Sequence, residues 1–79
     1  MQGYTIRVAE AINSADGDLL GVQLGRLCLQ HDVSVSKVAS YLGVTRQTVY
    51  SWFTGKSQPQ PEHEYAVGAL VAKLTKADA

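Results

Sequence analysis

Gly43 separates two short apolar patterns, and this arrangement constrains the fold more than any other feature of the sequence. Across residues 35–42, apolar side chains recur at intervals of three and four, which is the spacing of one helix face. Glycine can take the left-handed conformation that ends a helix at little steric cost. Thr45 then stands where it can cap a second short helix over about 46–54. The segment 34–55 is therefore predicted to form two short helices joined by a tight turn.

Both ends of this segment carry the residue types that start and stop helices. Ser34 precedes the first helix, where its hydroxyl can accept a hydrogen bond from a free backbone amide. Gly55 ends the second helix, and Lys56 places a cation near its carboxyl end, which the helix dipole favours. Two short helices in this relation are the layout of a helix-turn-helix, in which one helix braces and the other enters the major groove of DNA. The inward face of the second helix is predicted to be Val49, Trp52 and Phe53.

The stretch VSVSKVASYLGVTRQTVYSWFTGKSQP, residues 33–59, resembles the helix-turn-helix of the phage repressor and Cro family, also called the xenobiotic-response-element family. The resemblance implies an all-α, compact domain of four or five helices, lambda-repressor-like, with a central helix-turn-helix. In one respect the chain departs from the family, which often has glutamine where this chain has Val35, at the start of the bracing helix. The matching residues are Ala39, Gly43, Val44, Thr45, Val49, Trp52, Gly55, Lys56 and Pro59.

The resemblance also implies a role for individual side chains on DNA. The residues implied to contact base edges are Arg46, Gln47, Tyr50 and Ser51, and those implied to contact phosphates are Ser34, Ser36, Thr45, Thr54 and Lys56. The chemistry agrees, since arginine can bind guanine O6 and N7 and glutamine can pair with adenine N6 and N7. The alternative for Arg46 and Gln47 is an ordinary solvated helix face.

Charge is distributed unevenly along the chain, although the formal net charge is zero. A neutral balance counts against DNA binding when it is taken alone. Between residues 33 and 61, however, there are cations and no acidic residue. Such a segment can present a positive face to phosphates. The cations in it are Lys37, Arg46 and Lys56.

Length and composition favour a single small domain over residues 1–79. The hydrophobic fraction of 46% against 18% charged residues is high for this size, so part of the apolar surface is expected to be buried in a homodimer. Cys28 is the single cysteine and cannot form an internal disulfide, which fits a reducing cytoplasm. No signal peptide or membrane span is visible, so a cytoplasmic protein without a membrane partner is expected.

The flanks of the central segment are predicted to be helical. Asp16 or Asp18 is expected to cap a helix over about 19–31, and Pro61 can open a last helix over 61–76. The tail TKADA is expected to be frayed. Residues 1–15 are ambiguous: they form either a helix over about 6–14, which we favour, or a strand-like arm used for dimerisation.

An enzyme is not expected. Cys28 and His31 are three residues apart and can approach one metal, with Asp32 and His63 as further candidates, but no paired-ligand pattern of the CxxC or HxxxH kind exists. Cys28 on an apolar stripe is more often a small core residue. No phosphate loop, nucleophile elbow or paired catalytic carboxylates are found. We therefore expect no catalytic residue, metal, cofactor or small-molecule substrate.

Two functions remain open at this point. The first is a sequence-specific transcriptional regulator of phage or bacterial type that binds double-stranded DNA. It would be a repressor and a homodimer, reading a near-palindromic operator with helix 46–54 in the major groove. The second is a protein-interaction or structural module that keeps the helix-turn-helix fold without reading DNA. The exposed aromatic ring expected at Tyr50 would serve either.

Overall fold

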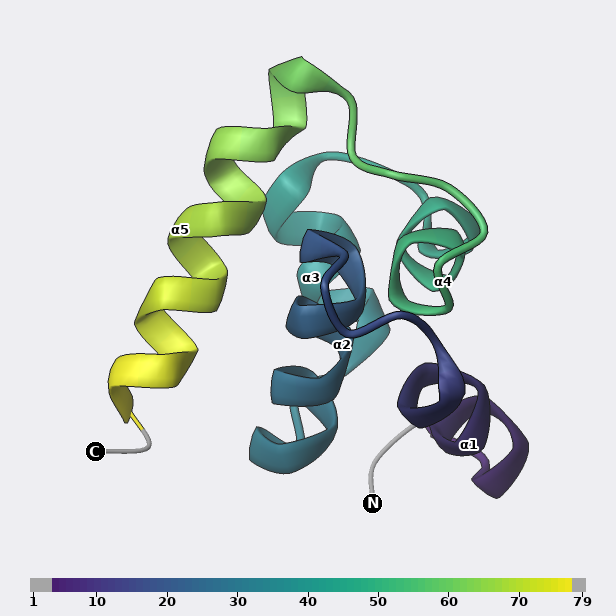
Figure 1. The fold of residues 1–79 in the computed structure, drawn as a ribbon. Helices are drawn as coiled ribbons and strands as arrows, with labels where there is room; N and C mark the ends of the chain where they lie inside the picture. Colours follow the sequence, from purple (N-terminus) through teal and green to yellow (C-terminus); the bar gives the residue numbers. More distant parts are fainter. Residues whose placement is uncertain (1–3, 78–79) are drawn as a thin grey trace.

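Helices α1 to α5 follow one another along residues 4–77, the part of the chain that this computed structural model describes (Figure 1). The all-α prediction is confirmed, with five helices in that range. Residues 1–3 of the expected arm, and residues 78 and 79 of the expected frayed tail, lie outside it. Within it, residues 75–77 continue the last helix instead of fraying. The helices are α1 (Ile6–Ser14), α2 (Leu20–His31), α3 (Val35–Leu42), α4 (Arg46–Phe53) and α5 (Pro61–Ala77).

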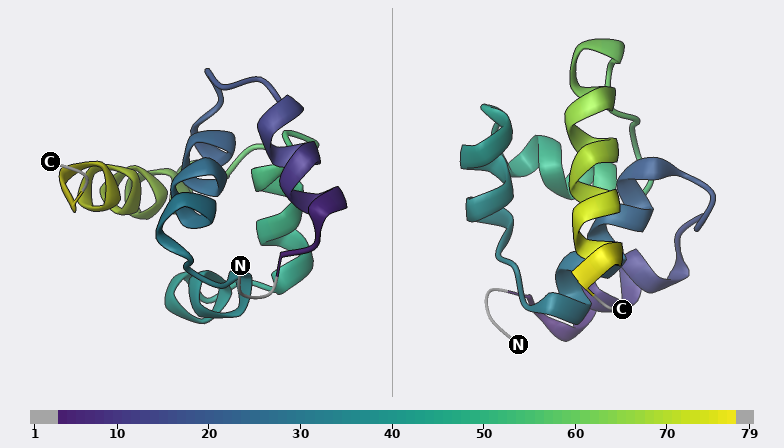
Figure 2. Two further views of the ribbon diagram at one scale, coloured as in Figure 1. Left: turned by 90° about the horizontal axis from the view of Figure 1, so that it is seen from below. Right: turned by 90° about the vertical axis from the view of Figure 1, so that its left-hand side faces the viewer.

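Helix α2 is central and contacts α1, α4 and α5, whereas α3 contacts α4 and α5 (Figure 1). Seen from below, α1 runs beside α4 on the side of the molecule away from α5 (Figure 2). One hydrophobic core joins the five helices, and the assignment of all 79 residues to one domain stays a prediction. The largest fully buried side chains of residues 4–77 are Phe53, Ile12, Leu24, Val22, Val49, Val67 and Cys28.

Two glycines of α2 allow α4 to pack at very short range. A Cβ atom on Gly21 would lie 2.7 Å from the carbonyl oxygen of Trp52, and one on Gly25 would lie 2.8 Å from Cγ of Phe53. Real Cβ contacts are longer, so the helix crossing depends on the absence of a side chain at both positions. This close approach fixes the position of α4, the second helix of the central segment, against the core.

The ambiguous N-terminal segment is helical, as favoured over the strand-like alternative. Thr5 caps α1, because its Oγ1 accepts a hydrogen bond of 3.2 Å from the amide of Val8. At the other end, the guanidinium of Arg26 on α2 donates hydrogen bonds to the carbonyl oxygens of Ile12, Asn13 and Ala15. A cation at this end also suits the helix dipole. Helix α1 is thus capped at both ends.

The predicted cap of α2 is wrong. Neither Asp16 nor Asp18 caps this helix, whose N-cap is Leu19 without a side-chain hydrogen bond. Instead, Oδ1 of Asp16 accepts a hydrogen bond of 2.9 Å from the amide of Asp18. The amide of Leu19 also bonds to the carbonyl oxygen of Asp16 at 3.1 Å, so Asp16 belongs to a turn that precedes the helix.

Helix α5 begins at Pro61, as predicted, with Glu62 and Glu64 in its first turn. It is the longest helix of residues 4–77, with 17 residues. In that range no helix combines the length and the apolar character that a bilayer crossing requires.

Candidate nucleic-acid interface

The turn between α3 and α4 has the geometry expected of a helix-turn-helix. Ser34 caps α3, with its Oγ accepting a hydrogen bond of 3.2 Å from the amide of Lys37. Gly43 has a φ of +71°, and the amide of Val44 bonds back to the carbonyl oxygen of Ala39 at 3.0 Å. This is the left-handed ending that the position of Gly43 predicts.

Helix α4 is closed by local hydrogen bonds at both ends. Oγ1 of Thr45 accepts a hydrogen bond of 3.1 Å from the amide of Thr48, which confirms the predicted cap. At the other end Gly55 has a φ of +78°, and the amide of Lys56 bonds to the carbonyl oxygen of Ser51 at 2.9 Å. The helix therefore presents a short, fixed set of side chains.

Burial divides α4 into an inward and an outward face. Val49, Trp52 and Phe53 are buried, as predicted. On the first turn, Arg46 and Gln47 are exposed. Because the buried face is held in the core, these two side chains have a defined direction outward from the molecule. An arginine and a glutamine held in this way can meet the hydrogen-bonding edges of bases.

A groove between α1 and α4 brings together most of the side chains implied to contact DNA. Gln47, Tyr50 and Ser51 line it together with Thr54 and Lys56. From α1 the lining residues are Arg7, Val8 and Ala11. Arg46 and Thr45 lie outside this lining, at the exposed start of α4, and Ser34 and Ser36 lie outside it at the start of α3.

Two of the predicted side chains are engaged within the protein. Tyr50 is half-buried and packs against the core. The same core contains Tyr4, and burial raises the pKa of its phenol above the usual range. The hydroxyl of Thr54 donates a hydrogen bond of 2.7 Å to the carbonyl oxygen of Tyr50. A phosphate only accepts hydrogen bonds, so Thr54 must release this bond to donate to one.

Val35, which stands where the family often has glutamine, is 4% exposed and belongs to the core. Its side chain therefore offers no hydrogen bond to a phosphate. At this end of α3 the polar side chains are Ser34 and Ser36, half-buried and exposed respectively. Since Ser34 uses its oxygen to accept from Lys37, its proton can still be donated to a phosphate oxygen.

Sequence reasoning missed the three lining residues from α1, of which Arg7 is the charged one. From the sequence a helix over about 6–14 was favoured over a strand-like arm, but an isolated arginine in that segment does not show which residues lie next to it in the fold. Helix α1 packs on α2, where Ile12 lies against Gly25, and this brings Arg7 to the groove beside α4.

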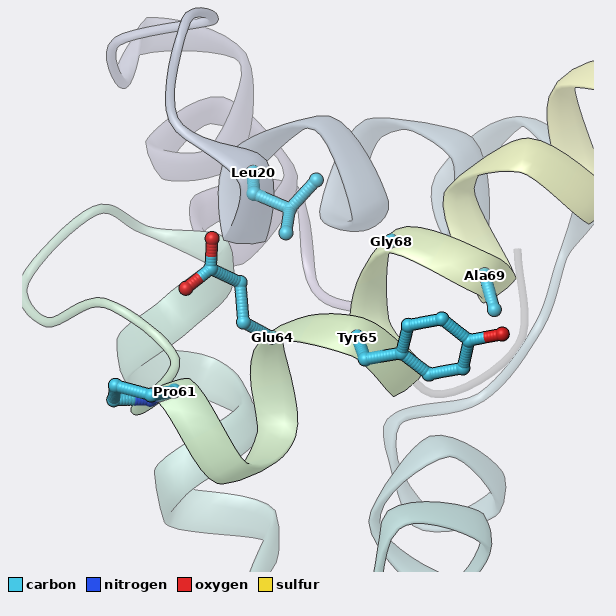
Figure 3. A pocket seen from close by; sticks show the side chains of 6 residues that line it. All are labelled: Leu20, Pro61, Glu64, Tyr65, Gly68 and Ala69. Carbon is cyan, nitrogen blue, oxygen red and sulfur yellow. The ribbon is translucent and has the colours of Figure 1, made fainter.

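The larger groove of the molecule lies between α2 and α5 and suits phosphate less well. In Figure 3 the carboxylate of Glu64 projects toward Leu20, and the ring of Tyr65 extends along α5 past Ala69. Its lining includes an acid and no cation, which would repel a nucleic-acid backbone. The lining residues are Leu20, Pro61, Glu64, Tyr65, Gly68 and Ala69.

The metal hypothesis finds no geometric support. Cys28 is fully buried, and burial raises the pKa of its thiol to about 12, which opposes the thiolate that a metal needs. Within residues 4–77, the His, Cys, Asp and Glu side chains form no group of three or more that would hold an ion.

The central part of the chain matches a known protein family. A family model described as helix-turn-helix matches residues 24–63, just over half of the 79 residues. The match runs from α2 through α3 and α4 to the first turn of α5, and it leaves α1 outside. No curated protein and no solved structure matches the chain.

Proposed function

The chain belongs to the Cro/C1-type helix-turn-helix family of DNA-binding regulators, and on this basis we propose that it binds double-stranded DNA sequence-specifically, with α4 in the major groove. The family is one of regulators and not of enzymes. In such a domain α3 crosses the backbone while the first residues of α4 meet base edges.

The observation that carries this proposal is the exposure of Arg46 and Gln47 on a helix whose opposite face is buried. We assign base contacts to these two residues first. Ser51 lies one turn further along α4, half-buried in the groove beside α1, and Tyr50 contributes the exposed part of its ring. The ring of a tyrosine can contact a thymine methyl group.

Phosphate contacts are assigned to polar groups around α4 and at the start of α3. Lys56 is exposed at the end of α4 and supplies a full positive charge. Hydroxyl groups add hydrogen bonds that fix the position of the protein without reading sequence. The hydroxyl residues assigned to this role are Ser34, Ser36, Thr45 and Thr54.

A homodimer on a near-palindromic operator is part of the proposal. The acid-free segment 33–61 carries three cations, which is few for a stable complex, and a second protomer doubles this set. Two α4 helices would then enter successive major grooves about 34 Å apart. Repression follows from occupancy, because a bound dimer excludes other proteins from the same grooves.

Selection of bound duplexes from a random pool tests the proposal, followed by affinity measurements on the recovered site at several salt concentrations. A DNA reader should enrich a half-site, repeated at about 10 base pairs, and its affinity should fall log-linearly with salt. No enrichment, together with flat or absent binding at all salt concentrations, would contradict it. That result would favour a protein-interaction module with the same fold.

A further inference from the structure

Helix α1 lies outside the family match, yet it stands beside the helix that is proposed to read DNA. The match begins at residue 24, whereas α1 ends at Ser14. In Figure 1 α1 lies next to α4, and the view from below in Figure 2 shows the same relation. Side chains of both helices line one groove. The membership of the family therefore assigns no role to α1, and its role must be found from its own contacts.

The position of α1 is fixed by contacts near both of its ends. Ile12 is fully buried, and its Cγ2 would lie only 3.2 Å from a Cβ atom on Gly25 of α2. Arg26 bonds to three carbonyl oxygens at the end of α1. Just before the helix, the hydroxyl of Tyr4 bonds to the carbonyl oxygen of Val33. A helix held in this way presents its exposed side chains in constant positions relative to α4.

The groove has a cation on each wall. Arg7 comes from α1, and Lys56 follows α4. Both are exposed, and no carboxylate lines the groove. The acid of α1, Glu10, is exposed but is not among the lining residues. A groove with one cation on each side, and with amide and hydroxyl groups between them, can bind the negatively charged backbone of a nucleic acid.

We infer that the DNA-binding surface extends from the helix-turn-helix onto α1, where Arg7 binds a backbone phosphate of the duplex that α4 reads. This inference rests on the proposed function. Gln47 and Ser51 line the same groove as Arg7, so a duplex that reaches those two side chains lies within reach of the arginine. The guanidinium can donate two parallel hydrogen bonds to one phosphate, which a lysine cannot do.

The test measures the salt dependence of affinity for the selected duplex with the full chain and three variants. Arg7→Ala should lower the slope of log affinity against log salt by about 0.9 for each bound protomer. At 0.1 M salt this corresponds to affinity about five- to tenfold weaker per protomer. Arg7→Lys should keep most of the slope, because it keeps the charge.

Lys73→Ala is the matched control, since it removes one exposed cation from α5, on a groove formed with α2 and α3. It should leave the slope unchanged. Circular dichroism should show the same helix content and melting temperature for all variants. An Arg7→Ala slope equal to that of the parent, or tighter binding by Arg7→Ala, would overturn the role of α1 while leaving the proposed function standing. A parent chain that binds no duplex would overturn both.

Discussion

The hydroxyl of Tyr4 donates a hydrogen bond of 2.7 Å to the carbonyl oxygen of Val33. These residues are 29 positions apart in the sequence. The bond joins the segment before α1 to the turn that leads into α3. Because Tyr4 is only 7% exposed, water cannot readily replace this bond. The helix outside the family match is therefore tied directly to the entrance of the helix-turn-helix.

Tyr4→Phe should destabilise the protein by about 1 kcal/mol, the usual net value of one hydrogen bond. The ring remains in the core, so the loss isolates the hydroxyl. Tyr65→Phe is the matched control, because Tyr65 is 87% exposed and should tolerate the same change without effect. Urea unfolding followed by circular dichroism measures both. Equal midpoints for parent and Tyr4→Phe would mean that the bond to Val33 contributes nothing to stability.

Gly25→Ala should destabilise the protein by about 1–2 kcal/mol, although alanine is the better helix former. A Cβ at this position would lie 2.9 Å from Cβ of Phe53 and 3.2 Å from Cγ2 of Ile12. Phe53 and Ile12 are both fully buried, so neither can move aside cheaply. The measurement is the free energy of unfolding in urea.

Gly68→Ala is the same substitution as Gly25→Ala, but it should stabilise the protein instead of destabilising it. Gly68 lies within α5, and a Cβ there would have no neighbour within 4 Å. The substitution should raise stability by up to about 1 kcal/mol through helix propensity alone. If both variants shifted the unfolding midpoint in the same direction, the predicted clash between a Cβ on Gly25 and Phe53 of α4 would be contradicted.

Local signals in the sequence predicted the helix-turn-helix because its boundaries depend on local hydrogen bonds. Ser34, Thr45 and Gly43 act within a few residues of their own positions, and the structure confirms each of them. The cap of α2 failed for a related reason. Two aspartates near a helix start offer alternative partners, and the sequence alone does not say that Asp16 bonds to Asp18.

Contacts between distant segments were not predictable in this way. From the sequence alone, Gly25 would be expected only to weaken its helix, and its close contact with Phe53 appears only in the folded structure. In the same way, Arg7 has the features of an ordinary surface residue, and only the position of α1 beside α4 brings it to the groove. Of the side chains implied to contact DNA, the exposure of Arg46 and Gln47 follows from helix period, whereas the bond of Thr54 to Tyr50 does not. The contacts with DNA themselves stay predictions.

Stability should fall as pH rises above about 8.5, and Cys28 should cause part of the fall. Its pKa is raised to about 12 by burial, so the folded state holds the proton more tightly than the unfolded state, where the thiol has its ordinary pKa. The contribution is therefore complete below about pH 8.5 and is lost as pH rises toward 12. The loss is at most about 1.4 kcal/mol per pH unit.

Urea unfolding between pH 7.5 and 10 measures this dependence. Cys28→Ala should be less stable than the parent at pH 7.5 because a buried side chain is shortened, but its stability should decline less over this range. Burial, the main cause of the raised pKa of Tyr4, is present in both proteins, so Tyr4 contributes a similar decline to each curve. Parallel curves for the two proteins would show that the thiol does not ionise on unfolding in this window.

Arg46→Ala and Gln47→Ala should each change the base preference of the protein at one position of its selected half-site. Both side chains are exposed on the first turn of α4, where bidentate hydrogen bonds to guanine or adenine discriminate by about 1–3 kcal/mol. Affinities for duplexes carrying each base at that position should therefore converge for the variant. Lys56→Ala is the contrasting variant. The loss of a phosphate contact should weaken binding to all duplexes equally and lower the salt slope. Uniform weakening by Arg46→Ala across all duplexes would reassign that residue from base reading to backbone contact.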